Sequence, residues 1–166
     1  MAQITLKGTP CNTSGELPKV GSKAPDFQLT DTDMQDHALA DFKGGMLVLN
    51  IVPSLETPVC AASARRFNEL AEQYSQVTMA TVSADLPFAQ KRVAQEDGTD
   101  NVKTLSTFRD DFARNYGVRL MDSPMAGLCA RAVVIIDGQG NVHYTQLVPE
   151  IAQEPDYDEV ERALAS

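Results

Sequence analysis

The chain has 166 residues, 43% of them hydrophobic, which suffices for the core of one domain and does not indicate disorder. Its 14 Lys and Arg residues stand against 23 Asp and Glu residues, and the net charge of −9 argues against a nucleic-acid backbone or an anionic membrane as a partner. No stretch reaches the roughly 18 apolar residues of a membrane-spanning helix. We therefore expect a single domain over residues 1–166.

The hydrophobic pattern predicts strands and helices that alternate along most of the chain. Ile4 and Leu6 alternate with polar neighbours and a polar turn follows, which predicts an N-terminal β-hairpin extension within residues 1–20. The run M-L-V-L-N-I-V at 46–52 is apolar on both faces, as a central strand covered by helices would be. The other predicted elements are strands at 25–30 and 77–83, helices at 60–74, 87–98, 108–116 and 154–165, and a hairpin of 131–137 with 141–148. This order is typical of a thioredoxin-like α/β fold.

The segment P-S-L-E-T-P-V-C at 53–60 joins the central strand to the first long helix. Thr57 is a preferred N-cap residue, and Pro58 suits the first helical position, where a missing N–H costs nothing. Cys60 is then the third helical residue, close to unpaired backbone N–H groups and to the positive end of the helix dipole. Such a place stabilises a thiolate, which is the nucleophilic form of cysteine.

A lone cysteine on the apolar face of a helix is more often an inert core residue. The position between strand and helix favours reactivity instead, because ligand sites in open α/β folds lie at the carboxyl ends of strands. Pro53 ends the strand and stiffens the loop, which presents Thr57 and Cys60 together at that end. We therefore interpret Cys60 as a candidate nucleophile.

The cysteines and histidines indicate neither a disulfide framework nor a metal site. Cys11, Cys60 and Cys129 are an odd, widely spaced set without a C-x-x-C motif, so we expect a reducing, cytoplasmic compartment. His37 and His143 share no ligand-like spacing with a cysteine or an acidic residue. We predict no metal and no other cofactor.

The residues around Cys60 resemble a known family. P-S-L-E-T-P-V-C fits the peroxiredoxin signature P-x-x-x-[TS]-x-x-C, and P-S-L-E-T-P-V-C-A-A-S is similar to the thiol peroxidase branch, the atypical two-cysteine peroxiredoxins. Four further segments resemble the same branch, namely S-A-D-L-P-F-A-Q (83–90), T-L-S-T-F-R (104–109), A-R-A-V-V-I-I-D (130–137) and E-P-D-Y (154–157). The resemblance therefore runs over nearly the whole chain.

The resemblance implies roles for four residues. Cys60 would be the peroxidatic cysteine, Thr57 the hydroxyl that hydrogen-bonds the thiolate and the peroxide, and Pro53 a shield against water. Arg131 would hold the thiolate and polarise the peroxide. Fixed donors aimed at the charge that develops on a departing oxygen are usually the largest catalytic contribution. The alternative for Arg131 is a surface salt bridge, which is what most arginines make.

The chain departs from the branch at the resolving cysteine. That cysteine usually stands in a stretch like R-F-C-G-A-E-G, whereas residues 92–98 read R-V-A-Q-E-D-G and place Ala94 at the matching position. The usual intramolecular disulfide cannot form, so Cys129, Cys11 or a thiol of another molecule must resolve an oxidised Cys60. We expect an external thiol, with Cys129 as the less favoured internal substitute.

The sequence thus predicts a thiol-dependent peroxidase that reduces hydrogen peroxide and organic hydroperoxides. The resemblance implies thioredoxin or another thiol as reductant, and a homodimer. The alternative is a non-catalytic thioredoxin-fold redox sensor or binding module, in which Cys60 oxidises once. A disulfide oxidoreductase is less favoured because the chain has no C-x-x-C motif.

Overall fold

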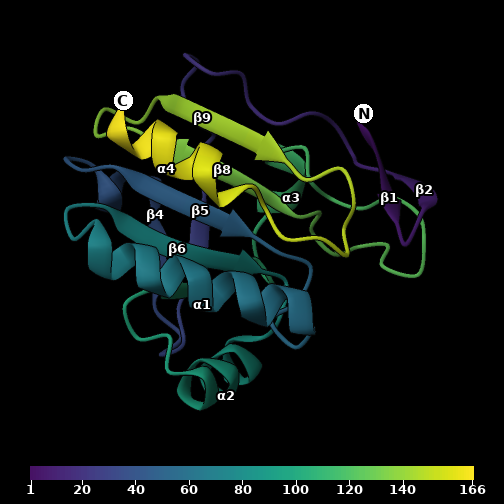
Figure 1. Cartoon of the computed structure of the whole chain (residues 1–166), viewed down its shortest axis with the longest axis horizontal. Helices are drawn as coiled ribbons and strands as arrows, with labels where there is room; N and C mark the ends of the chain where they lie inside the picture. Colours follow the sequence, from purple (N-terminus) through teal and green to yellow (C-terminus); the bar gives the residue numbers. More distant parts are fainter.

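The computed structural model describes all residues from Met1 to Ser166. A seven-stranded sheet in the order β4-β3-β7-β6-β5-β8-β9 forms its centre, and a separate two-stranded sheet of β1 and β2 stands beside one end (Figure 1). The strands are β1 (Gln3–Leu6), β2 (Thr9–Asn12), β3 (Gln28–Thr30), β4 (Asp36–Ala38), β5 (Leu47–Ile51), β6 (Thr78–Ser83), β7 (Lys103–Ser106), β8 (Ala132–Ile136) and β9 (Val142–Leu147). The helices are α1 (Pro58–Gln73), α2 (Pro87–Asp97), α3 (Phe112–Asn115) and α4 (Tyr157–Ala165), with a short 3-10 helix η1 (Leu39–Phe42).

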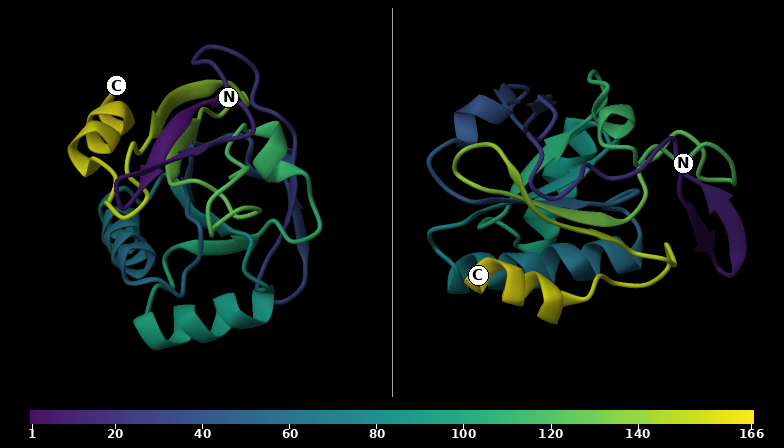
Figure 2. Two further views of the ribbon diagram at one scale, coloured as in Figure 1. Left: turned by 90° about the vertical axis from the view of Figure 1, so that its right-hand side faces the viewer. Right: turned by 90° about the horizontal axis from the view of Figure 1, so that it is seen from above.

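The central strand β5 is buried along its whole length because both faces of the sheet are covered. Side chains alternate between the faces of a strand, so Val48 points to one core and Leu49 to the other. Val48 packs with side chains of α1 and α4, which lie side by side on one face (Figures 1 and 2). Leu49 belongs to the larger core, which also contains Phe112 of α3 on the opposite face. This double cover explains why the run at 46–52 has no polar face.

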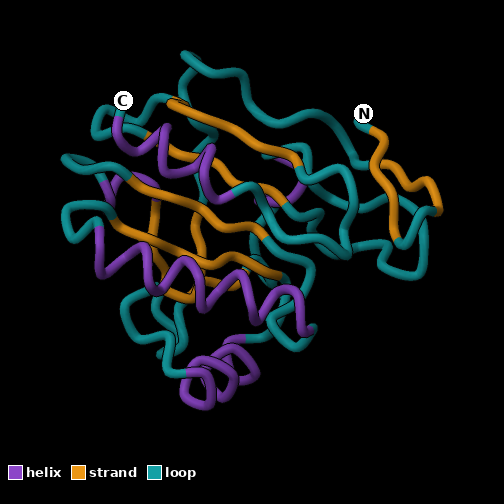
Figure 3. The backbone as a smooth tube through the Cα atoms, viewed as in Figure 1, coloured by secondary structure: helices purple, strands orange, loops and turns teal.

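The N-terminal hairpin of β1 and β2 is not hydrogen-bonded to the central sheet as a further strand, and Figure 3 shows it as a pair of strands set apart. Its inner face is nevertheless apolar and buried, because Ile4 and Cys11 lie in the larger core. In Figure 1 the carboxyl end of β5 points toward this side of the molecule. The hairpin therefore lies on the side where the loop before α1 begins. None of the helices is both long and apolar enough to cross a membrane.

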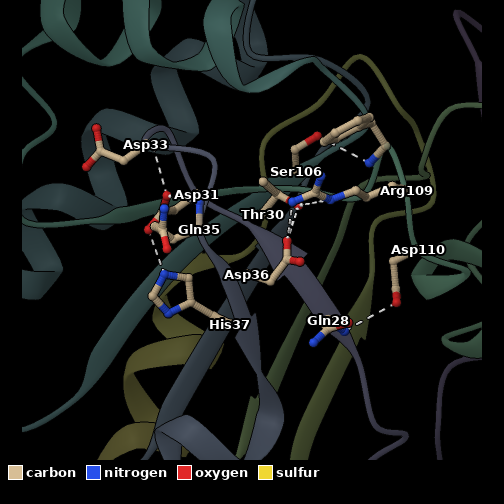
Figure 4. Close-up of polar contacts among 11 residues, drawn as sticks. Gln28, Thr30, Asp31, Asp33, Gln35, Asp36, His37, Ser106, Arg109 and Asp110 are labelled. Atoms are coloured by element: carbon tan, nitrogen blue, oxygen red, sulfur yellow. Dashed lines mark hydrogen bonds and ion pairs between the residues drawn. The ribbon is translucent and has the colours of Figure 1, made fainter.

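The helix expected at 108–116 is wrong in its first half, since α3 covers only Phe112–Asn115. The preceding residues form a turn that is tied to β3 and β4 (Figure 4). Arg109 donates to Asp36 over 2.8 Å and to Thr30 over 3.2 Å, and Asp110 accepts from the backbone N–H of Gln28. These contacts are made between distant parts of the chain, so the local helical pattern does not reveal them.

The sequence analysis also missed β4 and β7, which are three and four residues long. Their segments, D-H-A and K-T-L-S, each contain at most one large apolar side chain, so no alternating apolar pattern stands out. β7 is defined by its parallel pairing with β6, in which Leu105 lies opposite Val82. The strand thus becomes visible only when its neighbour is in place.

Candidate active site

The loop between β5 and α1 holds Cys60 at the start of the helix, as the N-cap pattern predicts. Thr57 is the N-cap, Pro58 the first helical residue, and the backbone N–H of Cys60 donates to Thr57 Oγ1 over 3.4 Å. The Thr57 hydroxyl itself donates to the backbone oxygen of Ser54 over 3.1 Å, which turns it inward across the loop. Cys60 has no exposed surface, and Pro53 is buried at the end of β5.

Arg131 lies directly before β8 and reaches the sulfur of Cys60. The register of the sheet explains why Arg131 lies close to Cys60, because β8 runs antiparallel to β5 and pairs Ala132 with Ile51. Arg131 therefore stands at the edge of the sheet where β5 ends. Its Nη2 donates to Cys60 Sγ over 3.2 Å, and its Nε donates to the backbone oxygen of Ile151 over 2.9 Å.

The guanidinium of Arg131 is only 2% exposed, so it is not the surface arginine of the alternative interpretation. Its Nη1 is also buried and has no hydrogen-bond partner within the protein. A buried donor without a partner is costly in an ordinary core. Here it belongs to the same planar group whose Nη2 contacts the Cys60 sulfur.

Asp85 is a site residue that the sequence analysis missed. It follows β6, the parallel neighbour of β5, and its carboxylate accepts from Ser54 Oγ over 2.7 Å and from the backbone N–H of Leu55 over 2.8 Å. It also accepts from Ser83 Oγ over 2.7 Å. Asp85 thus fixes the loop that carries Thr57. The signal was its place in S-A-D-L-P-F-A-Q, just past a strand parallel to the central one.

The other two cysteines do not pack against Cys60. The side chains that pack with Cys60 are Val52, Leu55, Ala64 and Val93, whereas Cys11 and Cys129 both belong to the larger core. All three cysteines are free thiols and are buried. Burial raises the pKa of Cys129 to about 12, although a hydrogen bond with Thr107 partly opposes this. The neutral thiol is therefore its stable form, and a neutral thiol is a weak nucleophile.

Ala94, at the family's resolving position, faces away from Cys60. Its neighbour Val93 packs against Cys60, while Ala94 lines a polar cleft of about 370 Å³ together with Asp31, Lys91 and other charged residues. Position 94 thus lies on a different face of α2 from the one that meets the candidate nucleophile.

The two histidines take part in structural contacts. His37 lies in β4 and its Nε2 is 2.6 Å from Asp31 Oδ2, an interaction that closes the turn between β3 and β4 (Figure 4). His143 Nε2 lies 2.9 Å from the backbone oxygen of Ala163 in α4. No group of three or more His, Cys, Asp or Glu side chains is arranged to hold a metal ion.

Comparison with known proteins relates this arrangement to a family. The family model described as Redoxin matches residues 19–161. A thiol peroxidase of Mycobacterium tuberculosis (strain ATCC 25618 / H37Rv) is 55% identical over 166 residues, which is the full length of both chains. A thiol peroxidase of Corynebacterium glutamicum is 46% identical over 164 residues and 99% of each chain.

Solved structures confirm the thioredoxin-like α/β fold. The crystal structure of a peroxiredoxin-like protein from Aquifex aeolicus superposes with a TM-score of 0.94 at 40% identity, over 99% of this chain and 97% of that one. A thiol peroxidase from Chromobacterium violaceum gives a TM-score of 0.92 at 23% identity, over 99% and 96% of the two chains, which supports the fold alone. The chain therefore belongs to the Redoxin family, in the thiol peroxidase branch of the peroxiredoxins.

Proposed function

We propose that Cys60 is the residue at which this thiol-dependent peroxidase reduces hydrogen peroxide and organic hydroperoxides. The observation that carries the proposal is the 3.2 Å contact between Arg131 Nη2 and Cys60 Sγ at the start of α1. A guanidinium stays charged at all ordinary pH values, so it places a fixed positive charge beside the sulfur. Neither of the other two cysteines accepts a hydrogen bond from an arginine.

The reaction follows from these groups. The Cys60 thiolate attacks one oxygen of the peroxide, an S–O bond forms and the O–O bond breaks. Cysteine is oxidised to sulfenic acid, and the departing oxygen takes up a proton from solvent to leave as water or an alcohol. The unpartnered Nη1 of Arg131 donates to the oxygen that gains negative charge. The second donor is the Thr57 hydroxyl, which turns to the peroxide from the Ser54 oxygen, its partner in the structure. Pro53 keeps water from the end of β5.

An external thiol then returns the sulfenic acid to the thiol. One reductant thiol forms a mixed disulfide with Cys60 and releases water, and a second thiol displaces Cys60 as a reductant disulfide forms. The absence of cysteine at position 94, together with the raised pKa of Cys129, favours this route over an internal disulfide. Thioredoxin is the reductant that the family membership suggests. Because Cys60 is fully buried, a protein reductant reaches it only after the first turn of α1 opens.

A homodimer in a reducing, cytoplasmic compartment completes the proposal, supported by the family and by three free cysteines. A non-catalytic redox sensor is not favoured, because the relatives that match over the full length are thiol peroxidases. The two functions differ in turnover. A sensor consumes one equivalent of peroxide for each chain, whereas a peroxidase consumes peroxide steadily as long as a thiol reductant is supplied.

The test is mass spectrometry after one equivalent of hydrogen peroxide, with a sulfenic-acid trap present and no added reductant. We expect the trap on Cys60 and no internal disulfide, followed by steady peroxide consumption once a thiol reductant is added. Rapid and complete loss of two thiols per chain would overturn the external-thiol route. Absence of steady consumption would overturn the peroxidase itself.

A further inference from the structure

The orientation of the Arg131 guanidinium depends on a hydrogen bond to one backbone oxygen, that of Ile151. The Nε–H and one Nη2–H leave the same edge of the planar guanidinium, and they donate to Ile151 O and Cys60 Sγ respectively. A movement of the Ile151 oxygen would therefore turn the guanidinium and carry Nη2 away from the sulfur. Ile151 itself lies just beyond β9, outside any regular element of the central sheet.

The N-terminal hairpin holds this backbone segment in place. The N–H of Ile151 donates to Thr5 O over 2.8 Å, and the N–H of Thr5 donates to Pro149 O over 2.8 Å. The two strands run parallel here, with Thr5 opposite Glu150. Ile4 and Ile151 also belong to the same buried core. A hairpin that is separate from the central sheet thus supports the residue that orients Arg131.

The carboxylate of Glu150 connects the tip of the hairpin to the backbone around Ile151. Its Oε1 accepts from Thr5 Oγ1 and from the N–H of Gly8, each over 2.9 Å. Its Oε2 accepts from the N–H of Lys7 over 3.0 Å and from the N–H of Ala152 over 2.8 Å. Glu150 precedes Ile151 and Ala152 follows it. The hydrogen bond between these two residues therefore spans the Ile151 carbonyl that accepts from Arg131.

The hairpin turn is shaped for this contact. Lys7 and Gly8 both have positive φ, 50° and 83°, and their two N–H groups converge on the carboxylate. Hydrogen bonds from Ala152, and next from Gly8, lower the pKa of Glu150 to about 2, so the group is ionised throughout the range in which the enzyme is assayed. A charged acceptor binds N–H donors more strongly than a neutral one.

We propose that Glu150 is a positioning residue for peroxide reduction, because it clamps the N-terminal hairpin to residues 149–152 and so fixes the Ile151 carbonyl that directs Arg131 toward Cys60. The inference rests on the proposed function, in which Arg131 stabilises the reacting groups. The N-terminal hairpin contributes no residue to the site, but it would affect the rate of peroxide reduction through Arg131.

The test is a double-mutant cycle between Glu150→Gln and Arg131→Met, measured as the rate at which hydrogen peroxide oxidises Cys60 in a single turnover. Gln keeps the size of the side chain but replaces one acceptor oxygen by an N–H₂ donor. In the place of Oε1 this donor faces the N–H of Gly8, and in the place of Oε2 it faces the N–H groups of Lys7 and Ala152. We expect Glu150→Gln to slow oxidation by about tenfold or more, since small displacements of a catalytic group carry penalties of that order. In the Arg131→Met background the same substitution should have no further effect.

A matched control is Glu16→Gln, which removes the same charge from an exposed side chain and should leave the rate unchanged. If Glu150→Gln folds poorly, Thr5→Val removes one donor to the carboxylate and should slow oxidation in the same direction by a smaller factor. Equal slowing in both Arg131 backgrounds, or none in the unsubstituted enzyme, would overturn the proposal.

Failure of the proposed function can be distinguished from failure of the Glu150 proposal. If Cys60→Ser remains active, the assignment of Cys60 is wrong whatever the cycle shows. If Arg131→Met alone oxidises at the unsubstituted rate, the part assigned to Arg131 is wrong, and with it the positioning effect of Glu150.

Discussion

Cys60 and Cys129 are equally buried and differ in almost everything else. Neither has any exposed surface. Cys60 stands in the first turn of α1, where Arg131 donates to its sulfur. Cys129 lies in the larger core, where burial raises its pKa to about 12 and the charge of Asp85 adds to that effect. One thiol faces a buried cation and the other has only a neutral hydroxyl, Thr107.

Under the proposed function, burial by itself does not decide whether a cysteine is reactive. Removal from water disfavours any thiolate, and only a fixed positive group or N–H donors reverse the preference. The two cysteines are therefore an internal test of the proposed site.

The largest effect is expected at Cys60 itself. Cys60→Ser should abolish peroxide consumption, because a serine hydroxyl lacks the nucleophilicity of a thiolate, while the circular dichroism spectrum stays that of the folded protein. Cys129→Ala is the matched control and should retain activity, since Cys129 does not pack against Cys60. Activity that survives in Cys60→Ser but disappears in Cys129→Ala would reverse the assignment.

The donors around Cys60 come next. Arg131→Met and Thr57→Val should each slow peroxide attack by about 10²–10³, the usual cost of removing a donor that meets developing charge. Their effect on a bulky, neutral alkylating agent should be much smaller, because no oxygen leaves in that reaction. Rapid-mixing measurements of both reactions provide the comparison. Equal slowing by both reagents would point to misfolding or lost access.

Asp85 links the two thiols, since it holds the loop before Cys60 and lies close enough to Cys129 to affect its pKa. Asp85→Asn leaves some of the donors from Ser54 and Leu55 without a partner. We expect the free energy of unfolding to fall by about 1–3 kcal/mol, and peroxide attack to slow as the loop loosens. Urea denaturation and single-turnover oxidation measure the two effects. Asp100→Asn, on the exposed surface, is the control and should change neither.

The smallest effect concerns pH and Cys129. Its folded pKa of about 12 exceeds the unfolded value of about 8.5–9, so the folded state holds the proton more tightly. The resulting stability is fully present below the unfolded pKa and is lost as pH rises toward 12. Between pH 7 and pH 10 the stability of the unsubstituted protein should fall by on the order of 1–2 kcal/mol more than that of Cys129→Ala. Urea denaturation at both pH values, under reducing conditions, would show an unchanged gap if Cys129 were not buried in this way.

Local chemistry made the start of α1 predictable. Thr57, Pro58 and Cys60 are adjacent residues whose preferences for the helix start can be read from the sequence, and the structure has the expected cap. The same holds for Gly98, which ends α2 in a left-handed conformation that suits glycine. Such features depend on contacts within a few residues.

Arg131 was identified from a resemblance to a family, because nothing near it in the chain indicates a partner 71 residues away. Asp85 and Glu150 were not singled out at all. Glu150 meets its hairpin donors across 142–145 residues, and Asp85 holds a loop 30 residues earlier in the chain. The helical pattern at 108–110 is misleading for the same reason, since the strands that hold this turn lie far away in sequence.

The order of most strands and helices, the family and the cysteine at the start of α1 all follow from the amino-acid sequence. Periodicity, capping and turn chemistry are local properties, and they act before the chain has any tertiary contacts. The charged groups that contact this cysteine, in contrast, depend on the folded structure. The antiparallel register of β5 with β8 brings Arg131 to Cys60, and the pairing of the N-terminal hairpin with residues 149–151 sets its direction. Those contacts depend on how distant segments pack, which no local pattern encodes.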